Sequence, residues 1–143
     1  MSAWGNRALL IDTSAWARSD RIEVEDEWQR ALFEDRLRLS PLIRLEILYS
    51  ARSPGSFDLL DKFLAAIRPV PVSPAIVAAA RGAMWQLSRR SAGSHRIPVV
   101  DYVVAATAQE IGADVLHYDA DYDRLAEVLA FESRWLAAAG ALA

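Results

Sequence analysis

The sequence of 143 residues contains no cysteine, one lysine (Lys62) and two histidines. The lack of cysteine excludes disulfide bonds and thiolate metal sites, and is typical of a protein of the reducing cytoplasm. No apolar run approaches the roughly 20 residues that a bilayer-spanning helix needs. The first residues also lack the charged and apolar parts of a signal peptide. These absences predict a cytoplasmic protein with no membrane segment.

Hydrophobic residues make up 53% of the sequence and charged residues 24%, which favours a packed globule. The length predicts a single domain spanning residues 1–143. The net charge of −3 does not favour nucleic-acid binding. However, divalent cations bound at an acidic site would reverse the local sign of the charge.

Apolar runs and helical patterns alternate along the chain. We expect strands at residues 8–11, 37–40, 69–72, 115–118 and 131–135, and helices at 23–35, 41–52, 57–67, 74–90, 99–111 and 121–129. Ser40-Pro41 and Ser73-Pro74 indicate helix starts, Ser53-Pro54-Gly55 a helix break, and Gly112 a helix end. Alternating strands and helices predict an α/β fold with a parallel sheet and helices on both faces.

Four acidic residues stand in apolar surroundings far apart in the sequence: Asp12, Glu46, Asp101 and Asp119. Carboxylates are rarely buried unless they are paired or bind a metal. Asp12 and Asp119 follow expected strands, whereas Glu46 and Asp101 lie on expected helices. Ligands of parallel α/β folds bind beyond the carboxyl ends of the strands. We therefore expect all four acids at that edge of the sheet.

Ligands that offer only oxygen favour a hard cation such as Mg²⁺ or Mn²⁺. Such an ion can activate water and stabilise a leaving oxygen, which suits phosphodiester hydrolysis. Each acid also has a structural explanation: Asp12 and Asp119 as cap or turn residues, Glu46 as the ion-pair partner of a nearby arginine, and Asp101 as a first-turn acid. Their joint pattern favours the metal site.

Four motifs carry a family resemblance. They are Leu9-Leu10-Ile11-Asp12-Thr13-Ser14-Ala15-Trp16, Glu46 within residues 44–52, Asp101 within residues 97–108, and Asp119-Ala120-Asp121-Tyr122-Asp123 within residues 115–125. With these motifs in this order, the chain resembles PIN-domain ribonucleases, and within them the VapC toxins of bacterial toxin–antitoxin pairs. The resemblance covers nearly the whole chain. It implies a three-layer α/β/α fold with a central, mainly parallel sheet of four to five strands.

The resemblance also implies roles for the acids, with Asp12 and Asp101 as central metal ligands and Glu46 and Asp119 completing the site. On a strand or tight turn, Asp121 points the same way as Asp119, so either could be the fourth ligand. By the same resemblance, Ser14 holds a ligand or a metal-bound water.

An activity and partners follow from the resemblance as expectations. It implies a Mg²⁺-dependent endoribonuclease that cuts tRNA or rRNA, forms a homodimer and is blocked by a VapB-like antitoxin. Promoter DNA would be bound only through the antitoxin. Trp16 and Trp28 could line the apolar groove that an antitoxin helix fills.

Two further features have open interpretations. Arg89, Arg90 and Arg96 flank the loop before Asp101, and they either contact substrate phosphates or belong to a solvated helix end. His117 lies within an expected strand, which favours a hydrogen-bonded structural role over that of a general base.

Two rival functions fit the sequence less well. A PIN-like module that binds RNA or a partner without cleavage would usually lack some of the acids, and none is missing from this chain. An aspartyl-phosphate phosphatase generally needs a second aspartate two residues after the first, and that position is Ser14.

Overall fold

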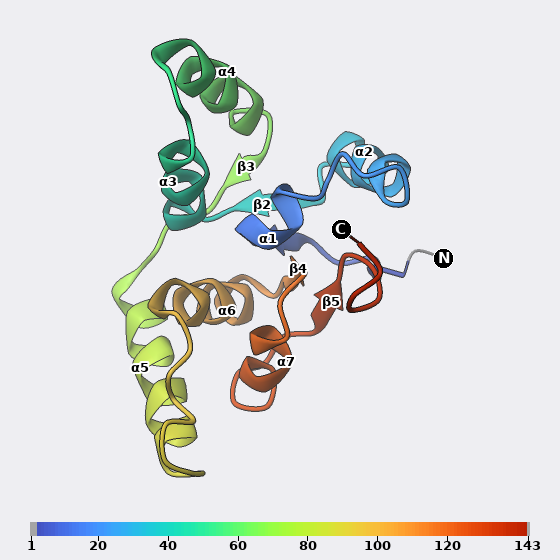
Figure 1. Cartoon of the computed structure of the whole chain (residues 1–143). Coiled ribbons are helices and arrows are strands. Elements are labelled where there is room, and N and C mark those ends of the chain that lie inside the picture. Colours follow the sequence, from blue (N-terminus) through green and yellow to red (C-terminus); the bar gives the residue numbers. More distant parts are fainter. Residues whose placement is uncertain (1–2, 143) are drawn as a thin grey trace.

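Five parallel strands form one sheet in the computed structural model, which describes residues 3–142 (Figure 1). The strand order is β3-β2-β1-β4-β5. The strands are β1 (Leu9–Ile11), β2 (Leu37–Leu39), β3 (Arg68–Pro69), β4 (Asp114–His117) and β5 (Ser133–Trp135). All pairings are parallel, and Leu9 lies opposite both Leu37 and Asp114. The predicted parallel α/β class is confirmed.

The helices connect successive strands. They are α1 (Thr13–Trp16), α2 (Glu25–Phe33), α3 (Pro41–Tyr49), α4 (Pro54–Leu64), α5 (Pro74–Ser88), α6 (Val99–Ile111) and α7 (Asp121–Leu125). The chain moves from β1 to β3 in one direction across the sheet, then returns to β4 and continues to β5. Because such crossovers are right-handed, the helices before and after β3 cover opposite faces.

Local capping chemistry sets several helix ends. The side chains of Ser40 and Ser73 accept backbone N–H groups of α3 and α5, and each is followed by proline at the first helical position. Gly112 ends α6 in the left-handed conformation at φ 69°, as predicted for a helix-ending glycine. α3 ends at Tyr49, three residues before its expected end at Arg52. Ser53 forms a capping box with Ser56, and α4 begins at Pro54. The predicted start of this helix at residue 57 was therefore three residues late.

Two other predicted boundaries were wrong. The strand expected at residues 69–72 is confined to Arg68–Pro69 at the sheet edge. Its last sheet contact is the bond from the Val70 N–H to the Leu39 carbonyl, and Pro71 has no N–H with which to continue. The helix expected at residues 121–129 ends at Leu125 and is followed by turns.

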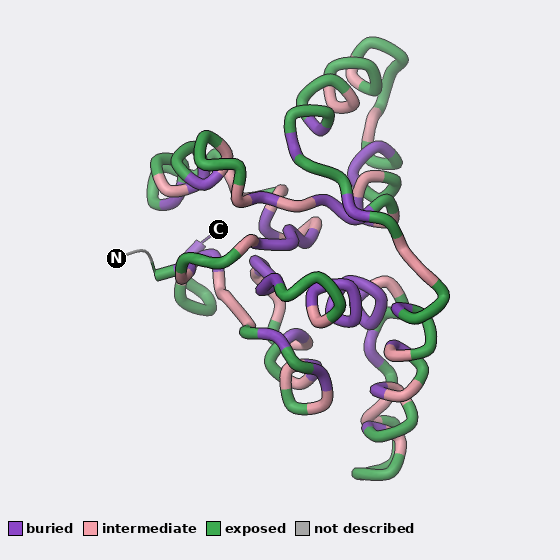
Figure 2. Tube along the Cα trace, turned by 180° about the vertical axis from the view of Figure 1, so that it is seen from behind, coloured by how far each residue is buried: buried purple, intermediate pink, exposed green. Residues whose placement is uncertain are grey.

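Burial is most continuous where β1 and β4 meet α6. Residues 101–108 of α6 are buried without interruption, and α6 contacts β1, β4, α5 and α7 (Figure 2). A helix that is buried on all sides must carry any polar residue into the interior. The sequence of α6 thus takes Asp101 into the protein, at 8% exposure. Among residues 3–142, no helix combines the length and apolarity needed to cross a membrane.

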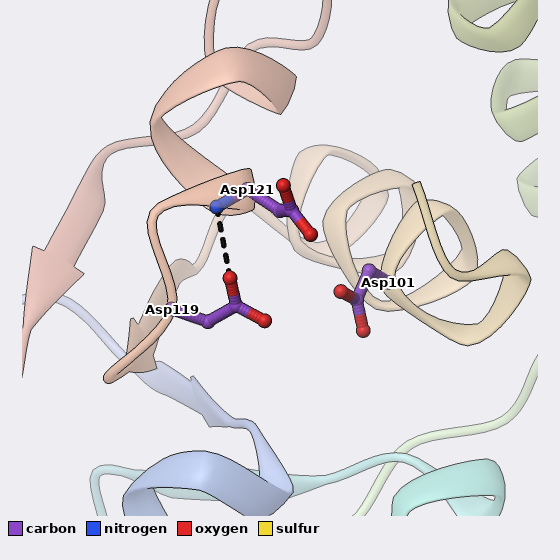
Figure 3. Close-up of side chains that lie close together, drawn as sticks. All are labelled: Asp101, Asp119 and Asp121. Atoms are coloured by element: carbon purple, nitrogen blue, oxygen red, sulfur yellow. Dashed lines mark hydrogen bonds between the residues drawn. The ribbon is translucent and has the colours of Figure 1, made fainter. Parts of the chain in front are cut away.

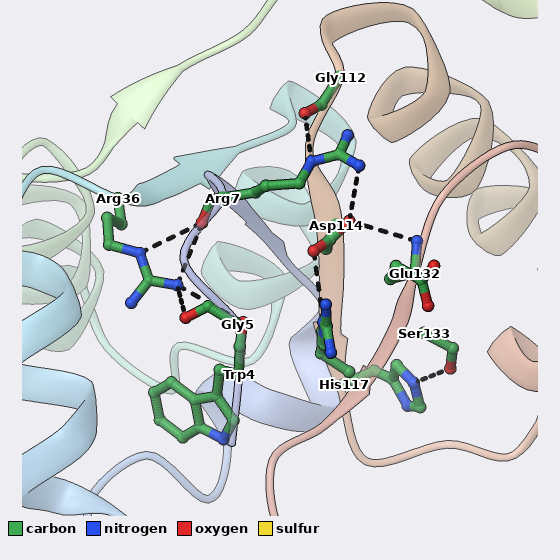
Figure 4. A network of polar contacts seen from close by, with 10 residues as sticks. Trp4, Gly5, Arg7, Arg36, Gly112, Asp114, His117, Glu132 and Ser133 are labelled. Atoms are coloured by element: carbon green, nitrogen blue, oxygen red, sulfur yellow. Dashed lines mark hydrogen bonds and ion pairs between the residues drawn. The ribbon is translucent and has the colours of Figure 1, made fainter. Parts of the chain in front are cut away.

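A polar network closes the end of the sheet at which β4 begins (Figure 4). Asp114 is fully buried and lies 3.6 Å from Arg7 and 3.3 Å from Arg134. It also accepts the Glu132 backbone N–H at 3.3 Å. Arg36 donates to the carbonyl of Gly5 at 2.8 Å and so ties the N-terminal segment to the start of β2. Buried charge at this end is therefore matched by arginine.

Candidate metal centre

The candidate site lies where the strand order reverses between β1 and β4. β1 leads to β2 on one side, whereas its other neighbour, β4, leads to β5. Asp12 directly follows β1, and Asp119 follows β4 after one intervening residue. Parallel α/β folds bind ligands at such a switch point, beyond the carboxyl ends of the strands.

Three carboxylates gather at this point. Asp101 from α6 and Asp119 and Asp121 from the corner between β4 and α7 each place one oxygen within 4.8 Å of the others (Figure 3). The backbone N–H of Asp121 donates to Asp119 Oδ1 at 3.0 Å, which fixes the corner. The sequence left the fourth acid open between Asp119 and Asp121, and the fold brings both into the cluster.

Asp12 is joined to this cluster through a tyrosine. The buried Tyr122 hydroxyl donates to Asp12 Oδ1 at 2.7 Å and lies 3.4 Å from Asp101 Oδ1. The other Asp12 oxygen, Oδ2, accepts the Ser14 N–H at 3.0 Å and also the Ser14 hydroxyl. Asp12 therefore caps α1, which is the structural role that the sequence suggested for it. In the same conformation it also faces the other acids.

The crowding of these acids changes their protonation. Burial, followed by the charges of Asp12, Asp119 and Asp121, raises the pKa of Asp101 to about 7. The pKa of Asp121 is raised by burial and by Asp119, against the opposing effect of Arg124. Burial and the neighbouring acids raise the pKa of Tyr122 well above its usual value of 10.0, so its hydroxyl stays a donor.

The donor set fits a hard divalent cation. Asp101 Oδ2 is buried and has no hydrogen-bond partner among residues 3–142. A buried carboxylate oxygen without a donor is costly unless a cation takes that place. The donor atoms of this cluster are carboxylate oxygens, the ligands that Mg²⁺ and Mn²⁺ prefer. Asp101, Asp119 and Asp121, with Asp12 beside them, could hold such an ion.

Glu46 lies apart from the three-carboxylate cluster. It projects from α3, is exposed, and accepts the Thr13 hydroxyl at 2.7 Å. Both residues line a surface hollow of about 540 Å³ with Leu45, Tyr49 and Val100. Glu46 thus borders the approach to α1, and the structure does not bring its carboxylate into contact with the other acids.

His117 supports the β4–α7 corner from behind. Its Nδ1 accepts the Asp119 backbone N–H at 3.1 Å, which requires the ring proton to be on Nε2. Nε2 lies 2.6 Å from the Ser133 hydroxyl, which donates to Asp123 at 2.7 Å. Burial lowers the pKa of His117 to about 4, against the raising effect of nearby acids. The geometry agrees with the structural role predicted for this histidine.

Sequence reasoning missed Tyr122 and Thr13. Tyr122 shares the buried face of α7 with Leu125, three residues later, so helical spacing could have indicated that its hydroxyl points inward. The Ser14 hydroxyl accepts the Tyr118 N–H at 2.9 Å while it donates to Asp12. Ser14 therefore contacts a predicted ligand, as expected, and also links α1 to β4.

Two of the three arginines predicted to flank the loop before α6 already have contacts within the protein. Arg90 donates to Glu127 at 2.7 Å, and the Arg89 guanidinium lies 5.2 Å from the Trp85 ring centre. Arg96 is exposed. The loop is fastened to α7 by a hydrogen bond from Arg124 to the Ser94 carbonyl.

A second hollow, of about 400 Å³, lies between α1, α2 and the end of α4. Trp16 and Trp28 line it together with Leu32, Phe63 and Ile67. The two tryptophan rings meet edge to face with centres 6.2 Å apart. The tryptophans predicted to line one groove therefore do so.

The fold and the cluster together define a class, that of a parallel α/β protein with a candidate carboxylate metal centre at its switch point. Residues 9–128 match the PIN domain family. The chain is 35% identical over 135 residues to Ribonuclease VapC18 of Mycobacterium tuberculosis, an alignment covering 94% of this chain and 98% of that protein. The chain therefore belongs to the PIN domain family and, within it, to the VapC ribonucleases.

Solved structures show the same fold. DNA-bound VapBC from Salmonella typhimurium includes a chain with a TM-score of 0.73 at 14% identity, covering 92% of this chain and 100% of that chain. VapBC-5 of Mycobacterium tuberculosis, from the VapBC family of toxin-antitoxin systems, gives 0.66 at 18% identity, covering 90% and 98%. The predicted three-layer PIN-like architecture is confirmed.

Proposed function

We propose that this protein is a metal-dependent endoribonuclease, the toxin of a toxin–antitoxin pair, which uses Mg²⁺ or Mn²⁺ to hydrolyse phosphodiester bonds of tRNA or rRNA in the cytoplasm. The observation that carries the proposal is the cluster of Asp101, Asp119 and Asp121, in which Asp101 is buried and one of its oxygens lacks a donor. The similarity to a ribonuclease across nearly the whole chain supports the reaction.

The acids have distinct parts in this proposal. Asp12 and Asp101 act as central ligands with Asp119 and Asp121 beside them, and Glu46 extends the acidic surface from α3. A bound ion supplies an activated water and stabilises charge on the leaving oxygen. Ser14 holds the Asp12 carboxylate in place, while burial around α6 limits the freedom of Asp101.

The test is cleavage of total RNA by the purified protein with Mg²⁺, with Mn²⁺ and with EDTA. We expect cleavage only with a divalent ion, and none by Asp12→Ala or Asp101→Ala. Asp58→Ala, an exposed acid of α4, is the matched control and should cleave normally. Equal cleavage by the wild type and both site variants would contradict the metal mechanism. RNA binding without cleavage by the wild type would instead favour the non-cleaving module.

A VapB-like antitoxin is the proposed partner, and the hollow lined by Trp16, Trp28 and Phe63 is its proposed docking groove. The solved neighbours from Salmonella typhimurium and Mycobacterium tuberculosis are VapBC systems, and the first is bound to DNA. Phe63 is 56% exposed at this groove, and an apolar helix face would cover it. In this proposal the antitoxin also carries the complex to promoter DNA.

The groove can be tested by co-expressing the protein with a candidate VapB-like antitoxin. Phe63→Glu should abolish co-purification of the pair. Phe33→Glu, which changes another exposed phenylalanine outside the groove, should leave the complex intact. Loss of the complex in both variants, or in neither, would contradict the assignment.

Two further parts of the proposal concern surfaces. Leu45, Tyr49 and Val99 are 63%, 93% and 67% exposed, and such apolar area beside the active site suits a homodimer contact. Tyr49→Glu should convert dimers to monomers in light scattering.

The loop arginines Arg89, Arg90 and Arg96 are proposed to contact substrate phosphates, since arginine suits that role.

A further inference from the structure

We propose that Tyr122 is a positioning residue of the metal centre: its hydroxyl holds Asp12 toward Asp101 and leaves Asp12 a single oxygen lone pair with which to bind the ion. The inference rests on the proposed function only in requiring that a divalent ion binds at this site. Tyr122 itself is not proposed to be a ligand.

The first step is an account of the hydrogen bonds of Asp12. An ionised carboxylate can accept about four hydrogen bonds. Oδ2 accepts both the N–H and the hydroxyl of Ser14, and Oδ1 accepts the Tyr122 hydroxyl at 2.7 Å. One lone pair, on Oδ1, is left. Asp12 can therefore offer the ion one bond, from the oxygen on the Asp101 side.

The second step concerns how firmly the hydroxyl is held. The Tyr122 ring is fully buried and stacks on His117, with ring centres 4.9 Å apart and planes 28° from parallel. His117 is in turn fixed by the Asp119 N–H and by Ser133. The Tyr122 ring is thus held in place by packing. Its hydroxyl is positioned by β4 and α7, the two elements that flank Asp119.

The third step is the effect of this hydroxyl on the two acids that it reaches. It lies 2.7 Å from Asp12 Oδ1 and 3.4 Å from Asp101 Oδ1, so it is a neutral donor between two carboxylates. Without it, their repulsion would favour turning Asp12 away from Asp101. An ion would then have to restore the arrangement when it binds, at a cost in affinity.

Tyr122→Phe removes the hydroxyl and keeps the ring. We expect isothermal titration with Mn²⁺ to show an affinity about 10- to 100-fold below that of the wild type, the usual effect of losing a hydrogen-bond partner of a metal ligand. Tyr102→Phe is the matched control, because this buried tyrosine donates to the His95 carbonyl at 2.7 Å instead of to an acid. It should bind Mn²⁺ as the wild type does.

An affinity of Tyr122→Phe equal to or above that of the wild type would overturn the inference, as would an equal loss in Tyr102→Phe. If the wild type binds Mn²⁺ but cuts no RNA, the proposed function fails while this inference can still hold. Should Tyr122→Phe not fold, proton NMR of the wild type replaces it. A protected Tyr122 hydroxyl proton that shifts on adding Mg²⁺ supports the role, and one that is absent or does not shift contradicts it.

Discussion

Two buried aspartates at opposite ends of the sheet have opposite surroundings. Asp114, at the start of β4, is fully buried and pairs with Arg134 and, as Figure 4 shows, with Arg7. Asp101, beyond the far end of β4, is 8% exposed, faces Asp119 and Asp121, and has an oxygen without a partner among residues 3–142 (Figure 3). Burial alone therefore does not mark a functional acid. What distinguishes Asp101 from Asp114 is the lack of a compensating donor at one of its oxygens.

The difference also separates stability from function. An acid paired with two arginines is satisfied by the fold itself, so its removal leaves two partly exposed arginines without their anionic partner. An acid surrounded by other acids is destabilised by their repulsion until a cation binds. Substitutions at the two sites should therefore change stability in opposite directions when no ion is present.

The largest expected effect comes from Asp114→Asn compared with Asp101→Asn in EDTA at pH 8. We expect Asp114→Asn to lower the free energy of unfolding by about 2 kcal/mol or more, below the usual cost for a buried pair because both arginines are partly exposed. Asp101→Asn should leave the free energy of unfolding unchanged or raise it, because repulsion is removed. Urea denaturation measures both, and a larger loss in Asp101→Asn would reverse the comparison.

The second prediction concerns pH. The pKa of Asp101 is raised from 3.8 to about 7, so the folded protein binds this proton more tightly than the unfolded chain does. The resulting stability is fully present below about pH 4 and is lost as pH rises through about 7. In EDTA, wild-type stability relative to Asp101→Asn should thus fall between these values. Saturating Mg²⁺ should remove the fall, and a flat difference without the ion would show that the Asp101 proton is not its cause.

The third prediction separates the two acids of the corner. Asp119→Asn should lower Mn²⁺ affinity more than Asp121→Asn, because Arg124 lies 3.7 Å from Asp121 and already offsets part of its charge. Calorimetric titration of both variants decides the order. The reverse order would make Asp121 the principal ligand of this corner.

The smallest effect is expected at the loop arginines. Arg96→Ala should weaken RNA binding more than Arg89→Ala or Arg90→Ala, since those two side chains already contact Trp85 and Glu127. Losing one phosphate contact should reduce the salt dependence of log affinity by about 0.7 for single-stranded RNA. Arg30→Ala, on α2, is the control. An unchanged slope in all three loop variants would remove the loop from the substrate surface.

Much of this organisation was predictable because its causes are local. Ser-Pro pairs begin α3 and α5, and Gly112 ends α6, through contacts within a few residues. The placement of Asp12 and Asp119 at the same edge of the sheet followed from one rule, that parallel strands share a carboxyl edge.

The details of the site depend on long-range packing and could not be read from spacing. Whether Glu46 reaches the cluster depends on how α3 rotates against α1, and its carboxylate accepts the Thr13 hydroxyl instead. The link from Tyr122 to Asp12 joins residues 110 positions apart in the sequence. No local sequence pattern indicates that two residues so far apart in the chain are in contact.

The most direct test of the central claim is Mn²⁺ binding by the wild type, Asp101→Asn and the exposed control Asp58→Asn. The wild type and Asp58→Asn should bind alike, and Asp101→Asn should lose more than about 100-fold in affinity, beyond the range for outer partners of a ligand. Equal binding by all three proteins, or none by the wild type, would contradict a metal centre at the carboxyl edge of the sheet.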